Sequence, residues 1–366
     1  MAEIGLSALR HNYRLLRSRI PASTSIFAVV KADGYGHGAV FVARTLEEEG
    51  ARMLGVATVE EGVELRRAGI RVPVVVLGGV DEPQAQEAHA HDLSSALFEA
   101  AQVGYLAREG RRSGVPFPVH IKVDTGMGRL GFLKERTREI LEAVAAHREV
   151  RVEGFMTHLS SADGRDPADR EFTGAQLRSF AEQVPLVRRA FGNGIAVHAL
   201  NSAGILTCPE HSFDLVRPGI ALYGSLPGEG IGETLGFRPV MRLVTQVVSL
   251  KELPDGHPVS YGRRYRCGGR RRIAVVPLGY ADGYRRSFSN AAPMAVGGRR
   301  VPVVGRVCMD HTMIDVTGIP EVSVGTEVVV MGGEGPTADD LARIADTIPY
   351  EILVQIGRRI PRRCVD

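Results

Sequence analysis

The sequence predicts an α/β fold: a (β/α)8 TIM-type barrel followed by a smaller, mostly-β C-terminal domain. Two observations predict it. From residue 25 the chain alternates short β-branched runs with amphipathic segments, eight times in about 220 residues, which is the size of eight strand–helix units. After Gly224, the glycine-rich segment SLPGEGIGETLGF leads into short valine-rich runs broken by glycine. We therefore expect a barrel over residues 1–230 and a mostly-β domain over residues 231–366.

The eight expected barrel strands are short apolar runs, as is typical of parallel strands buried on both faces. They are Ser25–Ala32, Met53–Ala57, Val72–Leu77, Leu93–Phe98, Val119–Asp124, Val152–His158, Ile195–Leu200 and Phe213–Val216. Segments with helical apolar spacing separate them, among them Ala39–Glu49, Val59–Ala68, Glu135–His147 and Ala168–Ala190. Such alternation requires parallel pairing. A doubly wound open sheet is the alternative, although it more often has fewer strands.

The composition excludes several classes of protein. The chain has 366 residues, of which 44% are hydrophobic and 24% charged, as in globular proteins, and its net charge of +3 gives no strong field for a polyanion. The four cysteines are scattered without metal-like spacing, which is typical of reduced thiols. The amino-terminal segment has no apolar core of a signal peptide, so we expect none, and no apolar run is long enough to span a bilayer. We expect a cytoplasmic protein with no metal, membrane or nucleic-acid partner.

A cluster of arginines in the second domain raises the question of nucleic-acid binding. Its members are Arg263, Arg264, Arg266, Arg270, Arg271 and Arg272. The cluster lacks stacking aromatics beyond Tyr265 and lies in no nucleic-acid motif, so we interpret it as a solvated loop.

Lys31 is the first candidate for chemistry. Lysine occurs at only four positions, and the segment IFAVVKADGYGHG places Lys31 at the carboxyl end of an apolar strand. That end of a barrel strand opens into the active site. Burial there lowers the pKa of an ammonium group, and the free amine is a nucleophile suited to a Schiff base. Three glycines follow and allow close approach of backbone or ligand.

A glycine-rich loop offers a competing interpretation. Gly126, Gly128 and Gly131 match G-x-G-x-x-G, and Glu153 follows at the expected end of the next strand. This is a dinucleotide-binding pattern, and it would favour a nicotinamide-dependent oxidoreductase. However, such a unit should open its domain, whereas here it is the fifth of eight repeats. The alternative interpretation is a polar lining of an active site, to which Arg129 and Lys122 would belong.

Further polar residues lie at the ends of the last three barrel strands. Arg217 ends the eighth strand, with Gly219 behind it, and Asn201 and Ser202 follow the seventh. Loops after the seventh and eighth strands of a barrel often bind phosphate through backbone N–H groups and a hydroxyl. His158 ends the sixth strand and is predicted to face the same mouth.

The motifs that contain these residues occur together and in a characteristic order. They are AVVKADGYGHG, KVDTGMGRLG, THLSSAD, NSAG, VRPGIALYG, VSYG, GYADG, GRVCMD and YEILVQIG. In this order the chain resembles the alanine racemases over about residues 2–361. The resemblance implies pyridoxal 5'-phosphate as cofactor, alanine as substrate, a homodimer with shared active sites, and D-alanine supply for peptidoglycan.

The resemblance also implies a role for each motif residue. Four catalytic residues are implied. Lys31 bonds the cofactor and is the base for D-alanine, and Tyr261 of the partner subunit is the base for L-alanine. His158 and Arg217 complete the set, and Arg217 faces the pyridine nitrogen. Further cofactor contacts are implied for Tyr35, Asn201, Ser202, Gly219, Ile220 and Tyr350. Arg129 and Met309 are implied to bind the substrate carboxylate, and Tyr280, Arg306 and Asp163 to line the entrance. Lys122 aligns with a lysine that is carbamylated in some members.

Racemisation needs a proton donor on each face of a planar α-carbon, which explains two opposed bases. Tyrosine, with a pKa near about 10, is a poor base unless its phenolate is stabilised, here by His158 and Arg217. An always-charged Arg217 disfavours a protonated pyridine ring. Two other classes of pyridoxal-phosphate protein are disfavoured. Fold-related decarboxylases pair the pyridine nitrogen with a carboxylate, where this chain has Arg217. Single-domain pyridoxal-phosphate proteins lack the second domain that this chain has. A racemase of broader specificity, acting on serine or other amino acids, remains an alternative.

Overall fold

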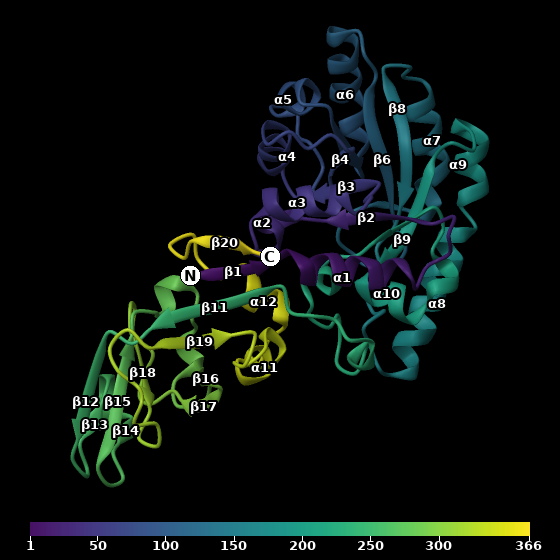
Figure 1. Ribbon diagram of the computed structural model, residues 1–366. Coiled ribbons are helices and arrows are strands. Elements are labelled where there is room, and N and C mark those ends of the chain that lie inside the picture. The colour runs from purple at the N-terminus through teal and green to yellow at the C-terminus, as the bar shows by residue number, and fades with distance from the viewer.

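The computed structural model describes residues 1–366 as two lobes joined at the middle (Figure 1). The larger lobe is a closed barrel of eight parallel strands in the order β5-β4-β3-β2-β10-β9-β8-β6, with β5 pairing β6 to close it. The strands are β2 (Ser25–Val29), β3 (Met53–Val56), β4 (Val74–Val76), β5 (Leu93–Leu97), β6 (Phe117–Asp124), β8 (Val150–Met156), β9 (Ala196–Asn201) and β10 (Leu215–Arg217). The predicted barrel and all eight of its strands are confirmed.

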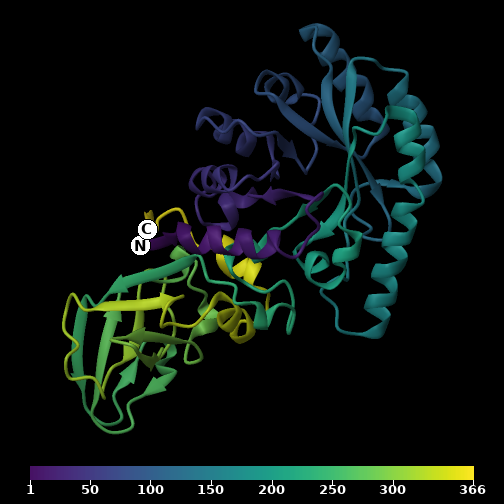
Figure 2. The ribbon, with the colours of Figure 1, turned by 45° about the vertical axis from the view of Figure 1, so that its right-hand side comes forward.

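Helices surround the barrel and separate its strands (Figure 2). They are α1 (Leu6–Arg17), α2 (Lys31–Tyr35), α3 (Ala39–Glu48), α4 (Val59–Arg67), α5 (Ala85–Ala90), α6 (Ala100–Ser113), α7 (Thr137–Ala145), α8 (Pro167–Ala181), α9 (Val184–Phe191) and α10 (Ser202–Thr207). The helical segment expected over Ala168–Ala190 forms two helices, because the chain breaks between α8 and α9 and Pro185 lies in the first turn of α9. Proline fits a first turn, where its missing N–H has no intrahelical acceptor.

The second lobe is built from two main sheets. A six-stranded sheet has the order β17-β16-β19-β11-β1-β20, and a three-stranded sheet has the order β12-β15-β18. Their strands are β1 (Ala2–Gly5), β11 (Met241–Gln246), β12 (Ser249–Leu253), β15 (Arg271–Val276), β16 (Pro293–Val296), β17 (Arg299–Pro302), β18 (Thr312–Asp315), β19 (Glu327–Met331) and β20 (Arg362–Val365). A short hairpin, β13 (Pro258–Val259) with β14 (Tyr265–Arg266), and two helices, α11 (Ala338–Ile344) and α12 (Pro349–Val354), complete it.

The amino-terminal strand departs from the expected division of the chain at residue 230. β1 belongs to the sheet of the second lobe, where it runs antiparallel to β11 and parallel to β20. The expectation that the barrel domain begins at residue 1 is therefore wrong for Ala2–Gly5. Both ends of the chain lie side by side between the lobes (Figure 1). A four-residue strand carries no sign in the sequence of which sheet it joins, because its partners are more than 230 residues away.

Buried Asn12 on α1 holds the segment that connects the lobes. Its side-chain amide donates to the carbonyl oxygens of Leu222 at 3.0 Å and Arg238 at 2.8 Å, and its oxygen accepts from the Arg238 N–H at 2.8 Å. A buried amide with all these bonds made is well satisfied. The first helix thus fixes the chain where it leaves the barrel for the second lobe.

Candidate active site

The carboxyl ends of the barrel strands open into a cavity of about 850 Å³. Eleven of the residues singled out in the sequence line it: Lys31, Tyr35, Lys122, Arg129, His158, Asn201, Ser202, Arg217, Gly219, Ile220 and Tyr350. Ten of them come from the strand ends and loops of the barrel, whereas Tyr350 lies on α12 of the second lobe. Residues as distant as Lys31 and Tyr350 therefore share one site.

The sequence reasoning did not identify several other residues of the cavity wall. They are Val29, Ala32, Ala57, Leu77, Gly78, Leu130, Met156, Thr157, Thr347, Ile348, Glu351 and Val354. Most are small or apolar and differ in no way from core residues when read along the chain. Their positions after β3 and β4, at strand ends, are the only signal that could have found Ala57, Leu77 and Gly78.

The backbone after Lys31 adopts an unusual conformation. The strand expected to reach Ala32 ends at Val29, and the next segment turns with left-handed residues at Ala32 (φ 54°), Asp33 (φ 53°), Gly34 (φ 60°) and Tyr35 (φ 54°). Each non-glycine residue in that region costs about 1–2 kcal/mol. Residues held in this way against their preference cluster at functional sites. The turn directly adjoins the lysine predicted to carry the chemistry.

Lys31 itself lies in the wall of the cavity. Burial lowers the pKa of its ammonium group, and the nearby cation of Arg129 lowers it further, while the carboxylate of Glu61 raises it. A lowered pKa increases the fraction of free amine, which is the reactive form towards an aldehyde.

Arg217 is a buried cation without an acidic partner. Its Nη1 donates to the Nδ1 of His198 at 2.7 Å and to the carbonyl of that residue at 2.9 Å. Its Nη2 donates to the carbonyls of Thr157 at 2.6 Å and Ala199 at 2.8 Å. Only the Nε–H makes no bond within the protein. Burial lowers the pKa of Arg217 to about 9, so the guanidinium is protonated near neutral pH.

His158 lies beside Arg217, with its Nδ1 3.5 Å from Nη2 of the arginine. Because a guanidinium N–H only donates, this contact favours the tautomer of His158 that carries its ring proton on Nε2. Burial is the main reason that the pKa of His158 lies well below its usual range. The cation of Arg217 and the other cations of the cavity lower it further. In that tautomer, neutral His158 can donate a hydrogen bond through Nε2.

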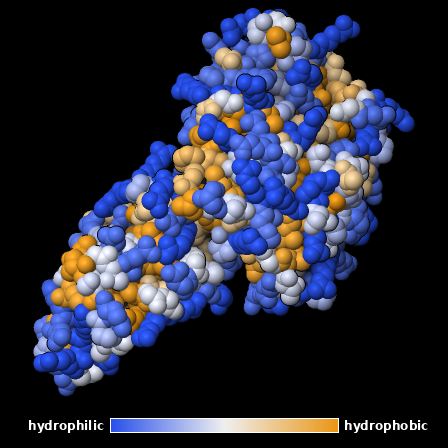
Figure 3. All heavy atoms as spheres, viewed as in Figure 1, coloured by the Kyte–Doolittle hydropathy of each residue, from blue (hydrophilic) through white to orange (hydrophobic).

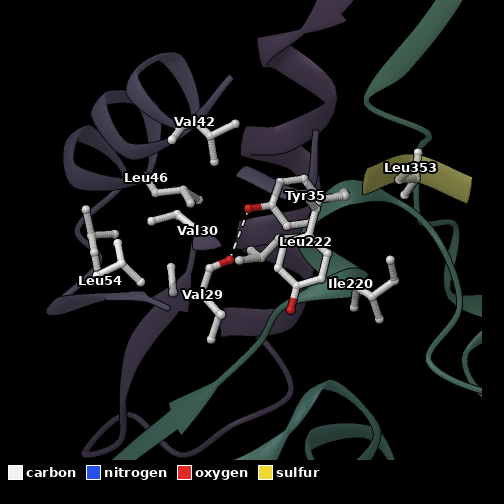
Figure 4. Packing of buried hydrophobic residues seen from close by; sticks show 14 of the residues in the cluster. Val29, Val30, Tyr35, Val42, Leu46, Leu54, Ile220, Leu222 and Leu353 are labelled. Carbon is white, nitrogen blue, oxygen red and sulfur yellow. Dashed lines mark hydrogen bonds between the residues drawn. The ribbon is translucent and has the colours of Figure 1, made fainter. Parts of the chain in front are cut away.

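Ser202 and the residues after β10 form a cluster of donors at the far side of the cavity. The Ser202 hydroxyl oxygen accepts from the N–H of Gly219 at 2.9 Å, and Ile220 begins a 3₁₀ helix, Ile220–Tyr223, whose first N–H has no intrahelical acceptor. A Cβ on Gly219 would lie 2.4 Å from the Tyr35 hydroxyl. Figure 4 shows Tyr35 packed in one cluster with Val29, Ile220 and Leu353.

These donors fit the expected pyridoxal phosphate. Its phosphate requires hydroxyl and backbone N–H donors, which Tyr35, Ser202 and the start of the 3₁₀ helix present together. Its pyridine nitrogen requires one donor, and Arg217 has one N–H left. Asn201 lines the cavity and also caps α10, since its Oδ1 accepts from the Gly204 N–H at 2.9 Å.

The predicted glycine-rich loop does not have the contacts of a dinucleotide site. The carboxylate of Asp124 accepts from the N–H groups of Gly126 and Met127 at 2.8 Å and of Arg129 at 3.2 Å, so these amides are already occupied. Glu153, expected at a strand end, lies within β8 and accepts from the Ser94 hydroxyl at 3.0 Å. The dinucleotide interpretation is therefore wrong, and Arg129 and Lys122 line the cavity instead.

Five of the residues singled out in the sequence do not line the cavity. Tyr261, Tyr280, Arg306 and Met309 lie in the second lobe, and Asp163 lies in the exposed loop after β8. Tyr261 is 69% exposed and Met309 53% exposed. The chain alone does not bring these residues to Lys31.

Comparison with known proteins identifies both lobes. The family model "Alanine racemase, N-terminal domain" matches residues 4–227, and "Alanine racemase, C-terminal domain" matches residues 240–364. The alanine racemase of Geobacter sulfurreducens is 42% identical over 99% of this chain and 96% of its own length. The alanine racemase of Symbiobacterium thermophilum is 45% identical over the same shares.

A solved structure gives the same result for the fold. Alanine racemase from Streptomyces coelicolor matches with a TM-score of 0.92 and 37% identity, over 100% of this chain and 98% of that one. The two family models match the two lobes in the order of the chain, and the relatives match nearly its whole length. Both findings identify the same family. The chain belongs to the alanine racemases, pyridoxal-phosphate-dependent isomerases that interconvert L- and D-alanine.

Proposed function

We propose that two copies of this chain form a homodimer whose shared active sites racemise alanine through two bases, Lys31 from one copy and Tyr261 from the other. One observation supports this most directly. The cavity holds the barrel residues of the expected site, whereas Tyr261 and Met309 are exposed on the second lobe of the same chain. A second copy that packs its second lobe over the cavity supplies them.

The exposed side chains of the second lobe support a protein partner there. Tyr280 is 43% exposed, besides Tyr261 and Met309, and apolar surface is visible on this lobe in Figure 3. Large apolar side chains that face solvent mark interaction surfaces when they gather. We assign Tyr280 and Arg306 of one copy and Asp163 of the other to the entrance of the shared site.

The residues of the cavity have distinct tasks in this proposal. When bound, pyridoxal phosphate supplies an aldehyde that bonds to amines and a ring that withdraws electrons from the alanine α-carbon. Lys31 anchors the cofactor. Its Nζ holds or releases a proton on the face of the α-carbon that carries the proton in D-alanine. Arg217 would donate its free Nε–H to the pyridine nitrogen, and its positive charge would keep that nitrogen unprotonated.

Tyr261 holds or releases a proton at its hydroxyl on the opposite face. The Nε2–H of His158 stabilises the phenolate form by donating to its oxygen, and the cation of Arg217 acts through the same histidine. Arg129 attracts the substrate carboxylate, with the Met309 backbone of the partner beside it.

Lys122, which aligns with a lysine that is carbamylated in some members, has surroundings that favour this modification. Burial, together with the cations of Arg217 and Arg129, lowers its pKa to about 8, so part of the amine is unprotonated near neutral pH. An unprotonated amine reacts with carbon dioxide, and the carboxylate so formed would neutralise the cationic wall next to Arg129. We propose this modification for Lys122.

Gly219→Ala is expected to weaken cofactor binding at least about tenfold, because the new methyl group occupies the position of the Tyr35 hydroxyl and displaces a phosphate donor. Titration of the cofactor-free protein with pyridoxal phosphate measures the dissociation constant. Gly194→Ala is the matched control, because its Cβ would meet nothing within 4 Å. Equal constants for the two variants would remove Tyr35 from the phosphate site.

The reaction and its specificity are tested with pure enantiomers. L-Alanine incubated with protein and pyridoxal phosphate is expected to yield D-alanine until the two are equal, as chiral chromatography measures. L-Serine under the same conditions is expected to react more slowly, since Tyr350 and the entrance residues narrow the site. Equal rates for both would favour the racemase of broader specificity.

D-Alanine made in this way supplies bacterial cell-wall peptidoglycan, and we assign the protein to that supply. No helix of the structure has the length and apolar character to cross a membrane. All four cysteines are free thiols, which supports a reducing compartment, and we propose the cytoplasm.

A further inference from the structure

Glu61 bonds to the loop that carries Lys31 from a neighbouring strand–helix unit. It lies in the first turn of α4 and reaches two backbone groups with its two carboxylate oxygens. Oε1 accepts from the Ala32 N–H and Oε2 from the Ala57 N–H, each at 2.7 Å. One carboxylate thus joins the loops that follow β2 and β3, two adjacent strands of the barrel.

The Ala32 N–H is the amide next to Lys31 and the first of the left-handed turn. Backbone bonds from the Gly34 N–H to the Val30 carbonyl and from the Gly36 N–H to the Ala32 carbonyl close the turn, and the other side-chain bonds hold only its later part. Asp33 accepts from the Ala39 N–H at 2.7 Å, His37 bonds through Nδ1 to the carbonyls of Gly34 and Tyr35, and Arg362 donates to the Gly36 carbonyl at 3.1 Å. Glu61 is therefore the side chain that holds the turn where it leaves Lys31.

The carboxylate also acts on Lys31 through its charge. The cations that face Lys31 come from β6 and its loop, namely Lys122 and Arg129, and neutral His158 faces it from the loop after β8. Glu61 is the acidic group that opposes them, since its charge raises the pKa of Lys31 while burial and Arg129 lower it. Glu61 therefore acts on Lys31 in two ways, through the bond to the Ala32 N–H and through its negative charge.

We infer that Glu61 is a positioning residue for Lys31, which holds the left-handed turn in place through the Ala32 N–H and balances the cations around the lysine. It touches neither substrate nor cofactor, since it does not line the cavity. The inference rests on the proposed function only for the role of Lys31. The bonds themselves are testable in cofactor-free protein.

The test compares Glu61→Ala and Glu61→Gln with Glu64→Ala, which removes an exposed carboxylate from the same helix. Amide hydrogen exchange in cofactor-free protein is expected to accelerate at least about tenfold at Ala32 and Ala57 in Glu61→Ala, and to remain as in the parent protein in Glu64→Ala. The dissociation constant of pyridoxal phosphate is expected to rise at least about tenfold in Glu61→Ala. Exchange in β8 and β9 shows whether each variant is folded.

Glu61→Gln separates the bond from the charge. Its amide oxygen still accepts one N–H, so slow exchange at one of the two amides is expected to return. The pH midpoint for covalent attachment of pyridoxal phosphate to Lys31 is expected to fall, because the charge that raises the lysine pKa is gone. If Glu61→Ala folds poorly, Glu61→Gln carries the test alone.

Unchanged exchange at Ala32 and Ala57, with cofactor affinity equal to that of Glu64→Ala, would overturn the inference. An unchanged pH midpoint in Glu61→Gln would overturn the role of its charge. These readouts need no turnover, so they stay distinct from the racemisation test with L-alanine, whose failure would concern the proposed function alone.

Discussion

Lys31→Ala is expected to lower racemisation in both directions at least about 10³-fold, because one side chain has two tasks. The amine anchors the cofactor, and it moves the proton on one face of the α-carbon. The alanine side chain that replaces Lys31 has neither a nucleophile nor a titratable group. None of the remaining lysines adjoins the left-handed turn, so none can take its place. Chiral chromatography of reactions begun from each enantiomer measures the loss, and visible absorption after desalting measures retained cofactor.

Lys251→Ala provides the control for Lys31→Ala. Lys251 is an exposed lysine in β12 of the second lobe, so its removal is expected to change neither rate nor cofactor retention. A Lys31→Ala protein that kept racemisation within tenfold of the parent would show that the lysine does not carry the chemistry.

Tyr261→Phe is expected to reduce racemisation by about 10²–10⁴-fold, the usual contribution of one acid–base group. The loss of α-proton exchange is expected for only one enantiomer, and that enantiomer identifies the missing base. In deuterated water, Lys31 should still exchange the α-proton of D-alanine, whereas exchange from L-alanine should be lost. Proton NMR of each pure enantiomer distinguishes them.

A nearby tyrosine serves as the control for Tyr261→Phe. Tyr265 lies four residues further on, and its hydroxyl donates to Asp315 at 3.3 Å, away from the proposed site. Tyr265→Phe is expected to exchange both enantiomers at parent rates. Loss of exchange from both enantiomers in Tyr261→Phe would contradict the two-base assignment.

Mixed dimers of these two variants test whether the site is shared. If Tyr261 acts on the partner's Lys31, a dimer of one Lys31→Ala chain and one Tyr261→Phe chain has one site with both changes and one intact site. Random pairing during co-expression then restores about a quarter of the parent activity. Restoration requires sharing, since a site within one chain would stay inactive in every combination.

The barrel was predictable because its strands are buried on both faces and therefore form continuous apolar runs, such as Val74–Val76. The site residues were predictable because the carboxyl ends of those strands share one mouth, which made Lys31, Ser202 and Arg217 neighbours before any distance was known. Both predictions follow from the regular geometry of parallel strand–helix units.

Other features depend on contacts that no local pattern reveals. The left-handed turn contains Ala32 and Asp33, which by themselves avoid that conformation, and distant Glu61 and Arg362 help to hold it. The glycine-rich loop after β6 matched a dinucleotide pattern because spacing does not show that Asp124 already binds its amides. The roles of Tyr261 and Met309 depend on a second copy, which a single sequence does not display.

The position of β1 between β11 and β20 has a consequence for how the two lobes and the lysine loop are joined. β1 pairs with β11 on one side and with β20 on the other, so its two neighbours come from distant parts of the chain. Arg362 of β20 also donates to the Gly36 carbonyl, beside the lysine loop. The sheet that holds β1, and with it this contact to the lysine loop, is therefore complete only when β20 has paired with β1.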